Sequence, residues 1–201
     1  MRYNTDGSLD TTFDGDGIAF PSTSASTFGN SLALQSDGNM VVAGTGATPN
    51  TEFAVARYDT TGSFDTNFNG DGYRFTPIPG GVNNHDIAYS VTVQPDGKVV
   101  TAGITDTTGG FQHDFALVRY DIDGTPDINF DTDDTDGIVN TDIFNNSNDD
   151  RAFDVAVQPD GKILAVGWTW NGANSDMALV RYNSNGSLDT TFDPLENDGI
   201  I

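Results

Sequence analysis

The sequence contains no cysteine, few basic residues and no long apolar run. The lack of cysteine excludes disulfides, zinc–thiolate sites and thiol catalysis. Only 8 Lys and Arg residues stand against 30 Asp and Glu residues, so the formal net charge is −22. This charge excludes nucleic acid as a partner, because phosphates must be met by basic side chains. Since no run of about 18 apolar residues occurs, we also expect no membrane insertion.

The sequence lacks sustained helical periodicity, and what it has instead is a repeat. An Arg-Tyr pair, a polar turn that contains glycine and a closing Phe occur together four times, at 2–13, 57–68, 119–130 and 181–192. A period of about 60 residues indicates one supersecondary unit copied along the chain. Each unit needs its neighbours to bury its apolar faces, so we expect a single repeat domain that spans residues 1–201.

One complete unit predicts four short strands. Residues 88–94 and 98–103 alternate or run apolar on either side of Pro95-Asp96-Gly97, a tight turn that joins them into a hairpin. Residues 71–75 predict a short strand before this hairpin, and residues 114–120 predict a strand after it. The near-continuous apolar runs are typical of strands that are buried on both faces.

These features favour an all-β fold, namely a β-propeller segment built from four-stranded antiparallel blades. We expect about three blades plus partial terminal repeats, with blade limits near 4–58, 59–120 and 121–182 and a partial repeat at 183–201. A β-solenoid or a string of small sandwiches is the alternative. Three blades do not easily close a ring, so we expect a segment of a longer protein or assembly with further copies of the same repeat.

The repeated Arg-Tyr, the Asp-Gly turn and the stretch Val93-Gln94-Pro95-Asp96-Gly97-Lys98 resemble the delta-60 repeat, a bacterial propeller-like repeat of large secreted or surface proteins. The resemblance covers almost the whole chain. Ser36 and Asn39 depart from it, because the other repeats have Pro and Lys at these positions, and Pro126 replaces the leucine of the first repeat. The resemblance implies a secreted or cell-surface location and no defined activity.

The repeated Arg residues are expected to be structural. We expect each to pair with the Asp eight positions later in its own repeat, as a charge-assisted clamp on the turn. The expected pairs are Arg2 with Asp10, Arg57 with Asp65, Arg119 with Asp127, and Arg181 with Asp189. The Phe that closes each segment is expected to pack between blades.

Oxygen-bearing side chains alternate around a glycine in these turns, an arrangement that suits calcium. The most acidic repeat gives the best candidate ligands, which are Asp121, Asp123, Asp127, Asp131 and Asp133. The alternative is a capped turn without metal, in which Asp or Asn accepts hydrogen bonds from the backbone. Calcium is therefore a secondary expectation.

Two aromatic and two imidazole side chains stand outside the repeat. Trp168 and Trp170 alternate along a predicted strand and so face the same side, where they are candidates for stacking on a sugar. Edge packing is the alternative. His85 and His113 occupy unrelated positions beside Asp86 and Asp114, and we expect them to be solvated loop residues.

The sequence therefore predicts a non-enzymatic extracellular or cell-surface scaffold or interaction module. Its partner would be a protein or glycan at the cell surface, or further copies of the same repeat. One alternative is a carbohydrate-binding or adhesive module, and another is a fragment of a propeller hydrolase or lyase. Non-repeating His, Glu or Tyr residues that converge in one cleft would favour the enzyme, and the sequence alone shows no such set.

Overall fold

The protein is described by a computed structural model that covers residues 1–20, 23, 25–47, 50–79, 85–106, 112–131, 136–144, 149–193 and 198–201. Its strands are β1 (Ser26–Leu34), β2 (Met40–Ala47), β3 (Thr51–Tyr58), β4 (Tyr73–Thr76), β5 (Ile87–Val93), β6 (Val99–Asp106), β7 (His113–Tyr120), β8 (Ile138–Thr141), β9 (Asp150–Val157), β10 (Ile163–Trp170) and β11 (Ser175–Tyr182). Within these residues there is no helix of the length and apolarity that a membrane crossing requires. The all-β expectation is confirmed.

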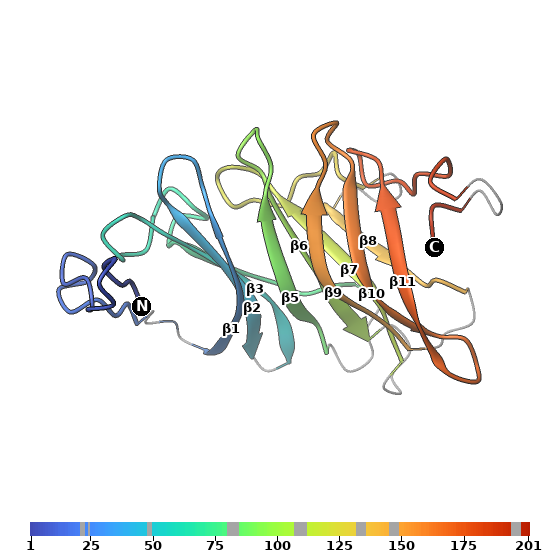
Figure 1. Cartoon of the computed structure of the whole chain (residues 1–201), viewed down its shortest axis with the longest axis horizontal. Helices are drawn as coiled ribbons and strands as arrows, with labels where there is room; N and C mark the ends of the chain where they lie inside the picture. The colour runs from blue at the N-terminus through green and yellow to red at the C-terminus, as the bar shows by residue number, and fades with distance from the viewer. Residues whose placement is uncertain are drawn as a thin grey trace.

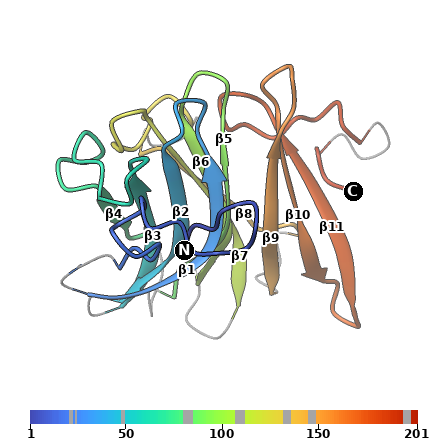
Figure 2. The same cartoon turned by 60° about the vertical axis from the view of Figure 1, so that its left-hand side comes forward.

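The strands form three antiparallel sheets that stand side by side (Figure 1). Sheet I has the order β1-β2-β3-β4, sheet II the order β5-β6-β7-β8, and sheet III contains β9, β10 and β11. Ile200 forms an isolated bridge to Val180 beside β11, where a fourth strand would lie. The turns that join β1 to β2, β5 to β6 and β9 to β10 all lie at the same end of the sheets (Figure 2).

The sheets are offset from the sequence repeats by one strand. The strand β4 follows the second Arg-Tyr turn, yet it pairs with β3 before that turn, with Val55 opposite Arg74. In the same way β8 pairs with β7, with Leu117 opposite Val139. Each turn therefore lies between the third and fourth strands of one sheet, and the repeat 59–120 supplies strands to two sheets.

Apolar side chains fill the two spaces between the sheets. One core cluster joins sheets I and II and includes Val55, Val99 and Tyr120, and a second joins sheets II and III and includes Leu117 and Ile163. Every residue of β6 and β7 is buried, because sheet II has a sheet on each side. This explains the continuous apolar runs that the sequence shows at these strands.

A glycine near the middle of each return strand permits a β-bulge in the strand beside it. The outer strand shifts register at the same place in all three sheets. A Cβ atom on the glycine would lie within 1.8 Å of a carbonyl oxygen of that strand, at Gly44, Gly103 and Gly167. These glycines therefore serve a close contact within each sheet.

Candidate functional site

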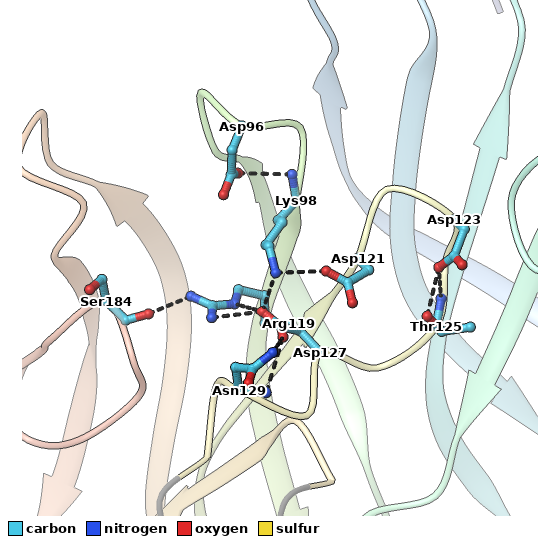
Figure 3. Close-up of polar contacts among 9 residues, drawn as sticks. All are labelled: Asp96, Lys98, Arg119, Asp121, Asp123, Thr125, Asp127, Asn129 and Ser184. Atoms are coloured by element: carbon cyan, nitrogen blue, oxygen red, sulfur yellow. Dashed lines mark hydrogen bonds and ion pairs between the residues drawn. The ribbon is translucent and has the colours of Figure 1, made fainter.

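A cluster of two cations and two carboxylates lies at the turn end of sheet II, and we call it the lysine site (Figure 3). It consists of Lys98, which precedes β6, Arg119 at the end of β7, and Asp121 and Asp127 in the turn that follows. The ammonium of Lys98 lies 2.6 Å from both Asp121 and Asp127, and the guanidinium of Arg119 lies 2.7 Å from Asp127. Asp127 is fully buried, so its charge depends on these two partners.

The charges at the lysine site stabilise one another. Burial acts to raise the pKa of Asp127, but hydrogen bonds from Lys98 and the Asn129 amide, together with the charge of Arg119, outweigh it and lower the pKa to about 2. Burial likewise acts to lower the pKa of Lys98, and hydrogen bonds to Asp121 and Asp127 reverse this and raise it. The shifts of Asp127 and Lys98 both favour the charged forms of these two groups.

The four predicted Arg–Asp pairs are all confirmed. The nitrogen–oxygen distances from the first pair to the last are 2.8, 2.8, 2.7 and 2.6 Å. Each guanidinium also lies over the Phe ring that closes its repeat, at 4.3 to 5.0 Å from the ring centroid. The sequence did not reveal a further contact, in which an arginine donates to a carbonyl of the next repeat, at Thr60, Ile122 and Ser184.

The repeated Phe residues pack where we expected them, against the turn of the following repeat. Phe13, Phe68 and Phe130 are buried, and a Cβ atom on the turn glycine of the next repeat would lie 3.0 Å or less from each of them. The arginine and the phenylalanine of one repeat thus both contact its neighbour. These residues hold the array together, which agrees with the structural role that we predicted for them.

The predicted calcium ligands do not all meet. Asp121 and Asp127 converge, but the ammonium of Lys98 lies between them. Asp123 is directed elsewhere and accepts hydrogen bonds from the amide and hydroxyl of Thr125 (Figure 3). Asp131 lies at the start of the following segment, and Asp133 falls outside the described residues. Calcium binding by these residues remains a prediction.

A second polar cluster lies at the opposite end of the sheets, and we call it the acid–histidine cluster. It comprises His85, His113, Asp114, Asp142, Asp149 and Asp150. His113 at the start of β7 is buried, and its Nδ1 lies 2.8 Å from Asp149, while its Nε2 lies 3.3 Å from a ring nitrogen of His85. Our expectation of two unrelated, solvated histidines is therefore wrong for His113, which is buried, and for the separation of the two rings, whereas His85 is exposed as expected. The rings meet because β5 and β7 both pack against β9.

Three carboxyl groups of this cluster form a compact trio. Asp114, Asp142 and Asp150 each present an oxygen within 4.8 Å of the others. Asp150 is fully buried and Asp114 is nearly so, while Asp142 after β8 is partly exposed. Such a trio offers three oxygen ligands to a divalent cation, or it keeps a proton among its members, because like charges this close oppose full ionisation.

Asp150 is held in place by two donors, the hydroxyl of Thr169 and the amide of Ile143, the latter at 2.8 Å. Its pKa is raised, chiefly by burial and in addition by the charges of Asp142 and Asp149, although the two hydrogen bonds act in the other direction. The same carboxyl group thus combines a fixed position with a raised pKa.

The neighbouring sheet shows which part of the trio is not repeated. Asp86, which precedes β5, is the counterpart of Asp150 at the start of β9. It accepts hydrogen bonds from the Thr105 hydroxyl and the Ile78 amide, as Asp150 does from Thr169 and Ile143. Burial raises its pKa as well. The register of the strands places Pro77 in sheet I where sheet II has Asp142. The third carboxyl group therefore occurs in only one of the two arrangements.

The two tryptophans lie on β10 beside this cluster. The ring of Trp168 lies 5.3 Å from the guanidinium of Arg151, which itself pairs with Asp149 at 2.9 Å. Trp170 ends the strand, is 38% exposed, and donates its backbone amide to the carbonyl of Asp149. Thr169 between them holds Asp150, so the exposed indole and the trio belong to the same end of sheet III.

Stacked antiparallel sheets that carry the same turn in each repeat are typical of a β-propeller repeat. A model of the family described as "Domain of unknown function (DUF5122) beta-propeller" matches residues 1–13, 35–68, 94–130 and 158–192, and the chain belongs to this family. The match confirms a propeller-type repeat. A comparison with curated proteins gives no match.

Among solved structures, the chain is similar to an exo-1,5-alpha-L-arabinanase from a bovine ruminal metagenomic library. The two are 12% identical, with a TM-score of 0.41, and the alignment covers 80% of this chain and 55% of the other. The chain thus spans about half the length of that enzyme.

The expectation of a non-enzymatic scaffold is contradicted, because the solved structure found in this comparison is an enzyme. The physical error lay in judging the chain by its repeated residues alone. Those residues hold the sheets together, whereas His113, Asp142 and Asp149 are not repeated and converge only when the sheets stack. A repeat architecture therefore does not exclude a dedicated site.

Proposed function

We propose that the chain is part of a propeller hydrolase that cleaves a polysaccharide with the carboxyl groups of Asp114, Asp142 and Asp150. The observation that carries this proposal is the trio, with three acid oxygens within 4.8 Å of one another at one end of the sheets. Hydrolysis of a glycosidic bond uses a pair of carboxyl groups, one that donates a proton and one that is ionised. Asp142 and Asp114 can form such a pair, and the buried Asp150 beside them has a raised pKa and influences their protonation.

The burial of each member assigns its role. Asp142 is the partly exposed member, so it is the group that meets the substrate and exchanges a proton with the glycosidic oxygen or with water. Asp150 is inaccessible and fixed by Thr169 and Ile143, so it acts as a positioning residue that influences the protonation of its neighbours. Asp114 supplies the second carboxyl group that the reaction requires.

The exposed Trp170 offers a stacking surface at the same end of sheet III, on the face of the sheet opposite to Thr169. An indole face packs well against the apolar face of a sugar ring, and this one adjoins the residue that holds Asp150. Trp168 is less suited to direct stacking, because the guanidinium of Arg151 lies over its ring. We propose that Trp168 orients Arg151 and Asp149, and that Trp170 contacts the sugar.

A secreted or cell-surface location is part of this proposal, because large polysaccharides lie outside the cell. The net charge of −22 favours neutral or cationic glycans over anionic ones, since a carboxylated polymer would be repelled. The resemblance to the delta-60 repeat is consistent with such a location. We propose that the chain is a repeat of this type.

The test is release of reducing ends from a panel of neutral polysaccharides that includes arabinan, xylan and β-glucan. We expect one of them to be cleaved, and Asp142→Asn to reduce the rate by at least ~100-fold, within the range of general acid–base catalysis. Asp176→Asn is the matched control, because Asp176 of β11 holds the repeat position of Asp114 but is exposed and lies outside the trio.

Two outcomes would contradict the proposal: no cleavage of any glycan, or equal rates for the Asp142→Asn variant and the unmodified chain. Addition of EDTA separates the two chemistries that the trio allows. Loss of activity with EDTA and its return with Ca²⁺ would assign the carboxylates to a metal and refute the acid–base roles.

A further inference from the structure

The first sheet lacks a cation that the other two sheets have. The lysine that follows the hairpin turn is Lys98 in sheet II and Lys162 in sheet III, and each ammonium lies 2.6 Å from the aspartate of the Arg–Asp pair. Asn39 takes this position in sheet I. Its amide lies 3.4 Å from Asp65, which makes a long and weak hydrogen bond.

The buried aspartates of the three sheets therefore differ in charge compensation. Asp127 and Asp189 each accept hydrogen bonds from one arginine and one lysine. Asp65 is 9% exposed, and among the described residues it has a single cationic partner, Arg57, at 2.8 Å. A buried carboxylate with one cation in place of two attracts a further positive charge.

The structure has an open space at this position. A hollow of about 630 Å³ lies between the turn that joins β1 to β2 and the turn that joins β5 to β6, and Asn39, Arg57 and Asp65 line it. Its volume greatly exceeds that of one ion, since a water molecule takes about 30 Å³ in the liquid. The hollow therefore has room for a ligand larger than an inorganic cation.

Two amide oxygens in the walls of this hollow have no partner among the described residues. Gln35 and Gln94 both line it, and the Oε1 atom of each is buried without a hydrogen bond. Gln94 is only 8% exposed, so an unpaired oxygen there is unfavourable and calls for a donor. Gln158 of sheet III has a similar oxygen, but it does not line this space.

The rim of the hollow is apolar. Leu34 from β1 and Ile122 from the turn after β7 line it and are 70% and 57% exposed. Val93 and Pro95 of the facing turn add further apolar surface. A ligand for this space thus needs a hydrocarbon part at the rim and a positively charged donor at its base.

We propose that this hollow binds a primary alkylammonium group, such as a lysine side chain of another protein or a free aliphatic diamine. The ammonium carries three donors, which suit the Asp65 carboxylate and the unpaired amide oxygens of Gln35 and Gln94. The methylene chain packs against Leu34 and Ile122, as lysine stems do on apolar surfaces. The bound group would complete in trans the arrangement that Lys98 makes within sheet II. The proposal is independent of hydrolysis, because the hollow and the trio lie at opposite ends of the sheets.

The test uses the full chain and two probes, Nα-acetyl-lysine N-methylamide and cadaverine, with binding followed by calorimetry and by chemical shift changes of the side-chain amides of Gln35 and Gln94. Nα-Acetyl-norleucine N-methylamide is the uncharged control, since it has a hydrocarbon chain but no ammonium. We expect one site, with at least tenfold weaker binding of the norleucine compound. Tighter binding of the lysine compound indicates a protein partner, and tighter binding of cadaverine indicates a free diamine.

Two variants sharpen the result. Asn39→Lys supplies the missing ammonium within the chain, so we expect it to raise the melting temperature and to reduce binding at least tenfold. Lys98→Asn recreates the vacant arrangement in sheet II, so we expect two sites in place of one. The proposal is refuted if neither probe binds, if Asn39→Lys binds as tightly as the unmodified chain, if the norleucine compound binds equally well, or if Ca²⁺ displaces the lysine compound at equal concentration.

Discussion

The strongest test of the fold is the substitution Arg119→Ala. Arg119 is 6% exposed, and its guanidinium joins three partners: Asp127 at 2.7 Å, the Ser184 carbonyl of the next repeat at 2.5 Å, and the ring of Phe130 at 4.4 Å. Removal of one member of a buried ion pair costs about 3–5 kcal/mol, because the other charge stays buried. Lys98 still compensates Asp127, so we expect the lower end, about 3 kcal/mol.

For a chain of this length, that loss corresponds to a decrease in melting temperature of about 6–12 °C. Circular dichroism and tryptophan fluorescence should both report it, because Trp168 and Trp170 lie in sheet III, which contacts Arg119 through Ser184. Arg2→Ala is the matched control. Its pair with Asp10 is partly exposed, with the Arg2 side chain at 33%, so its loss should cost less than about 1 kcal/mol. Equal effects of the two substitutions would refute our account of the repeated arginine.

Three further predictions concern the turns and the core. Gly7→Ala should destabilise the protein by about 1 kcal/mol, from its φ of +86° alone, whereas Gly186→Ala should cost above ~3 kcal/mol, because the new Cβ would also collide with the carbonyl oxygen of Phe130. Urea titration measures both free energies of unfolding, and equal losses of stability would contradict the contact between Gly186 and Phe130. The pKa of Asp127 is lowered to about 2, so its stabilisation is complete above its ordinary value of 3.8 and is lost as the pH falls toward 2. This group alone should contribute a decrease of about 2 kcal/mol in the unfolding free energy there, and Asp127→Asn should reduce the pH dependence by that amount, while the other carboxyl groups with lowered pKa, such as Asp189, keep theirs. Tyr120→Phe should cost about 1–2 kcal/mol, because it removes a buried hydrogen bond of 2.9 Å to a threonine hydroxyl; unchanged thermal unfolding would contradict this.

The parts that the sequence predicted correctly depend on local spacing. The pairing of Arg119 with Asp127 follows from eight residues and one turn, and the copies of this spacing make it distinctive. The hairpin around Pro95-Asp96-Gly97 follows from turn chemistry in the same way. Such features need no knowledge of how sheets lie beside one another.

The parts that it did not predict depend on contacts between sheets. His113 and Asp149 are 36 positions apart, and Asp149 directly precedes a strand of another sheet. Asp142 joins Asp114 and Asp150 only because β8 pairs with β7 and β9 packs against the same sheet. The recurrence of Lys98 and Lys162 was visible, but their partners were not, because each lysine lies more than twenty residues from its aspartate. A search for acidic residues that break the repeat pattern would have found Asp142.

The one-strand offset between repeats and sheets has a consequence for how such chains change length. A cut at any repeat limit removes strands from two sheets at once and exposes an unpaired edge on the sheet that remains. Gain or loss of a whole period, in contrast, leaves every sheet with a full set of partners wherever the junction falls. An insertion or deletion of complete periods is therefore expected to preserve the strand pairing of the sheets, wherever in the period it begins.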